Sequence, residues 1–108
     1  MIPYNEWSEN KNELLEFLEK RLEGAKKIAS QARAKGGYAK LTAWHFESKL
    51  PEYQKLIQLA KQKSKKEVKE KAETEFSHYM NKVRSARTEK EFQVASGQME
   101  VWGELVRL

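Results

Sequence analysis

Residues 38–53 read YAKLTAWHFESKLPEY, and this stretch determines the architecture of the 108-residue chain. Apolar residues recur in it at alternating spacings of three and four, as in a helix with one side against a core. The pattern extends beyond the stretch, through Ala39, Ala43, Phe46, Leu50, Tyr53, Ile57 and Ala60. It passes through Pro51, which removes one backbone hydrogen bond and crowds the preceding turn. We therefore predict one helical segment with a kink or a short break at Pro51.

A second set of apolar residues lies on the opposite side of the same segment. At about 100° per residue its members are Tyr38, Leu41, His45, Leu56 and Leu59, with Trp44 between the two sides. A small soluble protein rarely leaves a large second apolar patch exposed. The pattern predicts either an interface on this outer face or a central helix that the chain's own segments cover on both sides.

Turn and capping residues divide the rest of the chain into three further helices. Ser8 is the expected N-cap of a first helix, which should end at Gly36-Gly37, where glycine accepts a left-handed backbone. Ser64 and Thr88 each stand three residues before a glutamate. This is the form of a capping box, in which two side chains satisfy free backbone N–H groups of the first turn. Helices are therefore predicted to start next to Ser64 and Thr88.

Each of these helices carries an apolar stripe. The first has Leu15, Leu18, Leu22, Ala25, Ala29 and Ala32, and the third has Val68, Ala72, Phe76, Tyr79, Val83 and Ala86. The fourth has a main stripe of Phe92, Ala95, Met99, Trp102 and Val106, and a separate second stripe of Val94, Val101, Leu105 and Leu108. The second and fourth helices are thus the two with apolar residues on both sides.

Four helices of similar length joined by short connections predict an all-α fold, an antiparallel four-helix bundle. The chain is of a size for one domain, spanning residues 1–108, with a modest core. The alternative is a three-helix arrangement in which Ser64 is not an N-cap. The second and third segments would then form one long continuous helix.

Composition limits the class of protein. Charged residues make up 34% and apolar residues 39%, with five Gly and two Pro, which favours solvated helices over sheet or disorder. The absence of cysteine excludes disulfides and thiolate metal sites. The N-terminus lacks the apolar core of a signal peptide, and no apolar run is long enough to cross a membrane. We expect a soluble cytoplasmic protein that does not contact membrane.

Few residues could carry catalysis or hold a metal. Glu75 and His78 have the Glu-x-x-His spacing of di-metal helical bundles, but such sites need a second copy of the motif. The other histidine, His45, has Thr42 where the glutamate would be required. No glycine-rich phosphate loop and no arrangement of nucleophile, histidine and acid is present. We expect no enzyme activity, cofactor or metal, and interpret His45 as an interfacial residue.

The net charge of +5 is unevenly distributed, and segment 55–71 is rich in lysine. The residues that could contact phosphate are Lys61, Lys63, Lys65, Lys66 and Lys69. The segment contains no arginine to read base edges and no aromatic residue on which bases could stack. Any binding of nucleic acid by this segment would therefore depend on charge alone.

These patterns favour a small, non-catalytic helical protein-interaction module, either a homo-oligomer or a receptor for a partner helix. We predict that it self-associates through the outer faces of the second and fourth helices. The predicted interface residues are Tyr38, Leu41, Trp44, His45, Leu56, Leu59, Val94, Val101, Leu105 and Leu108. The alternative is a nucleic-acid-binding accessory protein that uses the lysine-rich segment 55–71.

Overall fold

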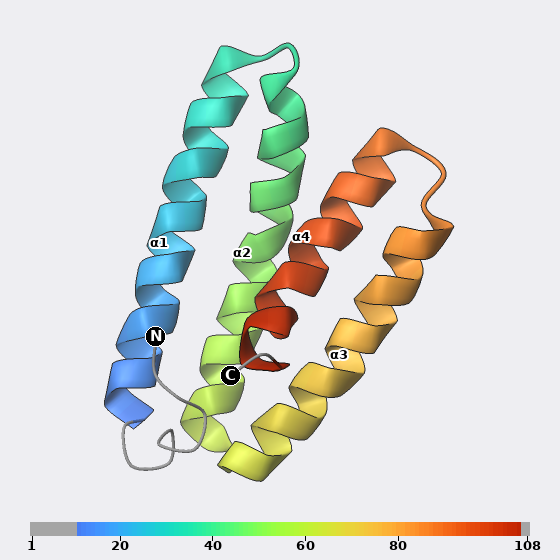
Figure 1. Cartoon of the computed structure of the whole chain (residues 1–108). Helices are drawn as coiled ribbons and strands as arrows, with labels where there is room; N and C mark the ends of the chain where they lie inside the picture. The colour runs from blue at the N-terminus through green and yellow to red at the C-terminus, as the bar shows by residue number, and fades with distance from the viewer. Residues whose placement is uncertain (1–10, 107–108) are drawn as a thin grey trace.

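The computed structural model describes residues 11–106, which form helices and contain no strand. The helices are α1 (Lys11–Lys35), α2 (Ala39–Gln62), α3 (Lys65–Ser85) and α4 (Glu89–Val106). In Figure 1 the α1–α2 and α3–α4 turns lie at the upper end of the molecule and the α2–α3 turn lies at the lower end. The prediction of an all-α protein with four packed helices is confirmed.

The chain leaves the helical conformation between α2 and α3. Lys63 and Ser64 both adopt extended backbone, each with ψ 161°. The Ser64 hydroxyl accepts a hydrogen bond from the Glu67 backbone N–H at 3.3 Å and donates one to the Glu67 carboxylate at 3.0 Å. This capping interaction starts a separate helix. The alternative of a continuous second helix is therefore wrong.

The other helix boundaries also follow the sequence signals. Gly36 and Gly37 have φ values of 66° and 59°, in the left-handed region that glycine adopts without strain. At the start of α4, the Thr88 hydroxyl accepts a hydrogen bond from the Glu91 backbone N–H at 3.1 Å. The predicted N-cap Ser8 lies outside the described residues.

Pro51 lies inside α2, and the helix continues on both sides of it. The prediction of one segment through the proline is confirmed, and the short break suggested as an option does not occur. No helix within residues 11–106 is long and apolar enough to cross a membrane.

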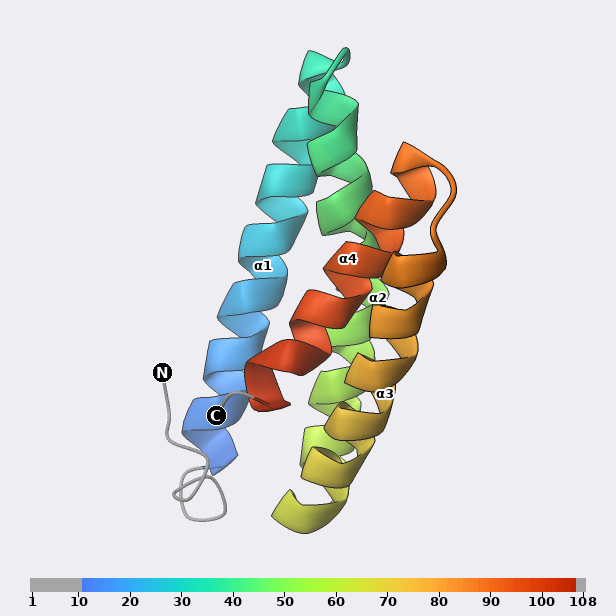
Figure 2. The same ribbon diagram turned by 45° about the vertical axis from the view of Figure 1, so that its right-hand side comes forward.

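α2 and α4 are the central helices. They pack against each other, α1 packs along α2, α3 packs along α4, and α2 and α3 make little contact (Figures 1 and 2). Each central helix therefore has neighbours on two sides. Both need apolar residues on two sides for packing within the chain alone.

This arrangement corrects part of the predicted interface. Leu56, Val101 and Leu105 are only 0%, 0% and 1% exposed, and they belong to the main apolar core together with Trp102. The prediction that these three leucine and valine side chains face outward is wrong. Their side of each helix contacts other helices of the same chain, the alternative that the sequence left open.

α4 approaches α2 closely at Gly97. A Cβ atom at this position would lie 2.2 Å from the His45 carbonyl oxygen and 2.2 Å from Ser48 Oγ. Such distances are far inside van der Waals contact, so the two helices can lie this close only because residue 97 has no side chain. The Ser48 hydroxyl donates to the same His45 carbonyl at 2.7 Å, which holds both atoms in place.

Candidate functional site

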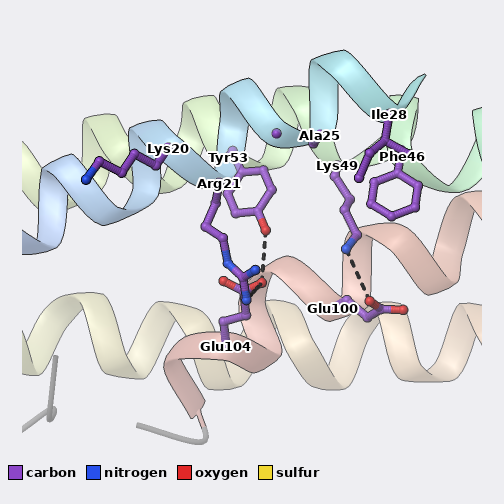
Figure 3. Close-up of a pocket in the computed structure, with 10 residues that line it drawn as sticks. Lys20, Arg21, Ala25, Ile28, Phe46, Lys49, Tyr53, Glu100 and Glu104 are labelled. Atoms are coloured by element: carbon purple, nitrogen blue, oxygen red, sulfur yellow. Dashed lines mark hydrogen bonds and ion pairs between the residues drawn. The ribbon is translucent and has the colours of Figure 1, made fainter. Parts of the chain in front are cut away.

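The candidate site is a groove between α1 and α4, with α2 at its base. α1 and α4 both pack on α2, but their backbones scarcely approach each other. The groove that results has a volume of about 830 Å³, and Figure 3 shows its side chains. The lining residues are Lys20, Arg21, Gly24, Ala25 and Ile28 from α1, Phe46, Lys49 and Tyr53 from α2, and Glu100 and Glu104 from α4.

At one end of the groove, to the right in Figure 3, the polar contacts centre on Glu100. Its carboxylate pairs with Lys49 Nζ at 3.2 Å and with His45 Nε2 at 3.0 Å. The hydrogen bond from His45, assisted by the positive charge of Lys49, lowers the pKa of Glu100 to about 2. Glu100 is therefore ionised at neutral pH, although its side chain is still 42% exposed and open to further contacts.

At the other end, to the left in Figure 3, the polar contacts centre on Glu104, one turn further along α4. Glu104 Oε1 accepts a hydrogen bond from the Tyr53 hydroxyl at 2.9 Å and lies 3.4 Å from an Arg21 guanidinium nitrogen. Burial and the nearby Glu104 carboxylate raise the pKa of Tyr53, so the hydroxyl stays protonated and remains a donor.

Glu104 has one hydrogen-bonding position that the described chain does not fill. Its side chain is only 10% exposed, and its Oε2 atom is buried without a hydrogen-bond partner. A buried carboxylate oxygen without a donor costs free energy, and native structures satisfy most such atoms. A donor that enters the groove from outside would relieve this cost.

A second polar cluster is sealed inside the bundle, away from the groove. Glu52 is 1% exposed, and its Oε1 accepts hydrogen bonds from the Tyr79 hydroxyl at 2.8 Å and from Trp102 Nε1 at 3.1 Å. Lys55 Nζ lies 3.2 Å from the other oxygen. Burial and the Glu52 carboxylate raise the pKa of Tyr79. This cluster joins α2, α3 and α4 through the buried side chains of Glu52 and Tyr79, so we interpret it as structural.

The remaining predicted interface residues do not form one continuous outer face. Tyr38 is 94% exposed, whereas Leu41, Trp44, Leu59 and Val94 are half-buried. The ring of Trp44 lies near two cations, Lys40 Nζ at 5.6 Å and Lys90 Nζ at 5.7 Å from its centroid. The His45 side chain is 14% exposed and faces Glu100, not solvent. Leu108 lies outside the described residues.

The lysines of segment 55–71 lie around the α2–α3 turn and the first turns of α3. Lys61, Lys63 and Lys66 are exposed, and Lys65 and Lys69 are half-buried. Lys63 lies 4.0 Å from the Glu67 carboxylate, and Lys71 pairs with Glu75 at 2.8 Å. Acidic neighbours therefore offset part of the positive charge that the sequence places here.

Glu75 and His78, which form half of a di-metal motif, do not lie in a group with further potential ligands among the described residues. Glu75 pairs with Lys71, and the exposed His78 packs edge-on against the Tyr79 ring. No group of three or more potential metal-ligating side chains occurs in the part of the chain that the structure describes.

Sequence reasoning missed the residues that define the groove. Glu100, Glu104 and Lys49 resemble ordinary surface charges in the sequence, because the apolar pattern says nothing about which charges pair across helices. A weak signal was present in the glycines inside the helices, such as Gly24 and Gly97, since glycine inside a helix is unfavourable and needs a reason.

Comparisons with protein families, with curated proteins and with solved structures give no match for this chain. The function proposed below is therefore argued from the groove and its surroundings.

Proposed function

We propose that this protein is a small, non-catalytic helical module that acts by binding protein, in the first place a second copy of itself. The observation that carries the proposal is the groove between α1 and α4, which is lined both by the partly exposed apolar side chain of Ile28 and by Glu104, whose buried Oε2 has no hydrogen-bond partner among the described residues. We also infer that the four helices are antiparallel to their neighbours, because their connections are short. We infer that α2 bends at Pro51, because proline has no backbone N–H to donate within the helix.

The shape of the groove supports a protein partner. Two helices about parallel to one another form its walls, and such a groove accepts the apolar face of a further helix. Ile28 is 39% exposed on one wall, and the half-buried Phe46 continues the apolar surface at the base. Charged residues border this strip on both walls, an apolar centre with a polar rim as in protein interfaces.

The chemistry of the groove supports binding over catalysis. Its carboxylates are already engaged, Glu100 with Lys49 and His45, and Glu104 with Tyr53 and Arg21. No serine, threonine or cysteine is among the described lining residues, and Lys49 and Tyr53 are held by Glu100 and Glu104.

A second candidate surface is what remains of the predicted outer face of α2 and α4. Trp44 and Val94 border the same shallow depression, and the exposed Tyr38 lies at the start of α2. We treat this surface as the rival location for self-association. Binding of nucleic acid through segment 55–71 has less support, because Glu67 and Glu75 pair with lysines there.

The test is the mass in solution, by light scattering after size exclusion, from micromolar to millimolar concentration and at low and high salt. We expect a mass above the 12.7 kDa of one chain, rising with concentration. Ile28→Lys should return the protein to the monomer, because it places a charge on the apolar wall of the groove. Phe92→Lys is the matched control, since Phe92 is similarly exposed, at 42%, but does not line the groove.

Two results would contradict the proposal. A monomer at every concentration removes self-association altogether. An oligomer that Trp44→Asp dissociates and Ile28→Lys does not would move the interface to the outer face of α2 and α4.

A further inference from the structure

Nothing among residues 11–106 explains the glycine at position 24. It lies in the middle of α1, and a Cβ atom there would have no heavy atom within 4 Å. Glycine in a helix interior is about 1 kcal/mol less favourable than alanine. Nothing inside the described chain requires the missing side chain, and Gly24 lines the groove.

The residues around Gly24 form a separate face of α1. At about 100° per residue, the following lie within roughly 40° of Gly24: Glu13, Phe17, Lys20, Ile28, Gln31 and Lys35. Phe17 is half-buried and the other five are exposed. The buried residues of α1, such as Leu18 and Ala25, lie on the side that faces α2. We call the set that includes Gly24 the Gly24 face.

We propose that a second copy of the chain packs its α1 antiparallel against this α1, with the two helices crossing at Gly24. The inference rests on the proposed self-association and specifies which face, partner and register it uses. A glycine at the crossing lets two helix backbones approach closely, as Gly97 does between α2 and α4 within the chain.

The charges of the Gly24 face fit this register. In an antiparallel pair, residues equally far before and after Gly24 oppose each other, so Glu13 of one copy faces Lys35 of the second copy. Both residues stand eleven positions from Gly24, and two-fold symmetry produces the pair twice. Neither side chain has an ion-pair partner among the described residues.

The apolar and long side chains fit the same register. Phe17 of one copy faces Gln31 of the second copy, one turn from its exposed Ile28. Lys20 faces Ile28 of the second copy, and its aliphatic stem can cover that side chain while the ammonium group stays in water. The crossing therefore removes the exposed part of Ile28 from water in both copies.

The position of α4 provides a third complementary contact between the two copies. Two-fold symmetry places the α4 helices of the two copies on the same side of the α1 pair. In this register Arg21 of the second copy stands at the level of Lys27 along α1, and on the α4 side it lies beside Ile28, near the level of Glu100 in Figure 3. Glu100 is ionised and 42% exposed, so it can accept a further cation.

The decisive experiment is a charge exchange, read by sedimentation equilibrium of the full chain. Glu13→Lys and Lys35→Glu should each raise the dimer dissociation constant about tenfold, because each replaces two attractive pairs with two repulsive ones. The double variant restores attraction with reversed signs and should return the constant to within about threefold of wild type.

Gly24→Leu tests the crossing point. The single chain has open space for the side chain, so folding is retained, and the dimer should dissociate by at least about tenfold because the backbones can no longer approach. Ser30→Leu, at an exposed position on another face of α1, is the matched control and should leave dimerisation unchanged.

The outcomes separate this inference from the proposed function. If wild type self-associates but neither Gly24→Leu nor the charge exchange has an effect, the α1 pairing is wrong and self-association stands. If the double variant does not recover, the register is wrong. A monomeric wild type would overturn both.

Discussion

The two sides of α4 differ in how completely they are filled. Toward α2, the helices are so close that a methyl group on Gly97 would lie 2.2 Å from backbone and side-chain oxygen atoms. Toward α1, the helices enclose a groove of about 830 Å³, where a methyl group on Gly24 would touch nothing. Glycine thus allows close contact between helices on one side of α4. On the other side it lines a groove that the described residues do not fill.

Buried carboxylates show the same contrast. On the closed side, Glu52 receives donors from Tyr79, Trp102 and Lys55. On the open side, Glu104 has one oxygen atom with no hydrogen-bond partner among the described residues. Within residues 11–106, the bundle satisfies its buried carboxylate where the helices are closed, and leaves one carboxylate oxygen without a donor beside the groove.

The largest expected effect is at the closed side. Glu52→Ala should lower the free energy of unfolding by about 3 kcal/mol, because it leaves the buried donors of Tyr79 and Trp102 without an acceptor. Urea denaturation measures this change. Gln58→Ala, at an exposed position of the same helix, should change stability by less than about 0.5 kcal/mol.

A double-mutant cycle identifies the cause of that loss. If stranded donors are responsible, Tyr79→Phe should cost about 1 kcal/mol in wild type and markedly less in the Glu52→Ala background. Equal costs in both backgrounds would instead attribute the loss to packing. The contrast between satisfied and unsatisfied carboxylates would then lose its energetic basis.

The next effect compares the two glycines directly. Gly97→Ala should destabilise the fold by about 1–3 kcal/mol, since α4 must move away from α2 to accept the methyl group. Gly24→Ala should stabilise the dilute monomer by up to about 1 kcal/mol, because alanine favours the helix and meets no neighbour. Urea denaturation at low protein concentration measures both, and changes of the same sign would contradict the contrast.

The helices and their ends could be predicted from the sequence because local chemistry determines them. Gly36-Gly37, Ser64 and Thr88 act through bonds within one or two turns, and all appear where the sequence predicts them. Which side of α2 and α4 is exposed could not be predicted from the sequence. Leu56, Val101 and Leu105 form the same periodic pattern whether the second apolar side contacts another protein or a neighbouring helix of the same chain.

The candidate site was even less accessible from the sequence. His45 was singled out by residue type, but its partner Glu100 is far away in the chain, and pairing across helices leaves no periodic signal. The apolar pattern likewise does not predict a buried Lys49 or Glu52, because these side chains are tolerated only through partners on other helices. Long-range polar pairing thus required the three-dimensional structure.

The smallest predicted effect concerns Glu100, which stands at the border between the closed contact and the groove. The hydrogen bond from His45 and the charge of Lys49 lower its pKa from the ordinary value of 4.5 to about 2. The unfolded chain therefore takes up a proton at this group at higher pH than the folded chain does. The stabilisation that Glu100 provides is complete above about pH 5 and is lost as the pH falls to about 2.

Glu100→Gln should remove that pH-dependent contribution. Because the side chain is 42% exposed, solvent screening limits the expected loss at neutral pH to about 1 kcal/mol. Urea denaturation of wild type and variant between pH 7 and pH 2, at protein concentrations where both are monomeric, should give two curves that converge in the acid range. A difference that stays constant over this range would mean that His45 and Lys49 do not hold the carboxylate in the folded chain. Glu100 would then belong to the open groove alone, with no part in the contact between α2 and α4.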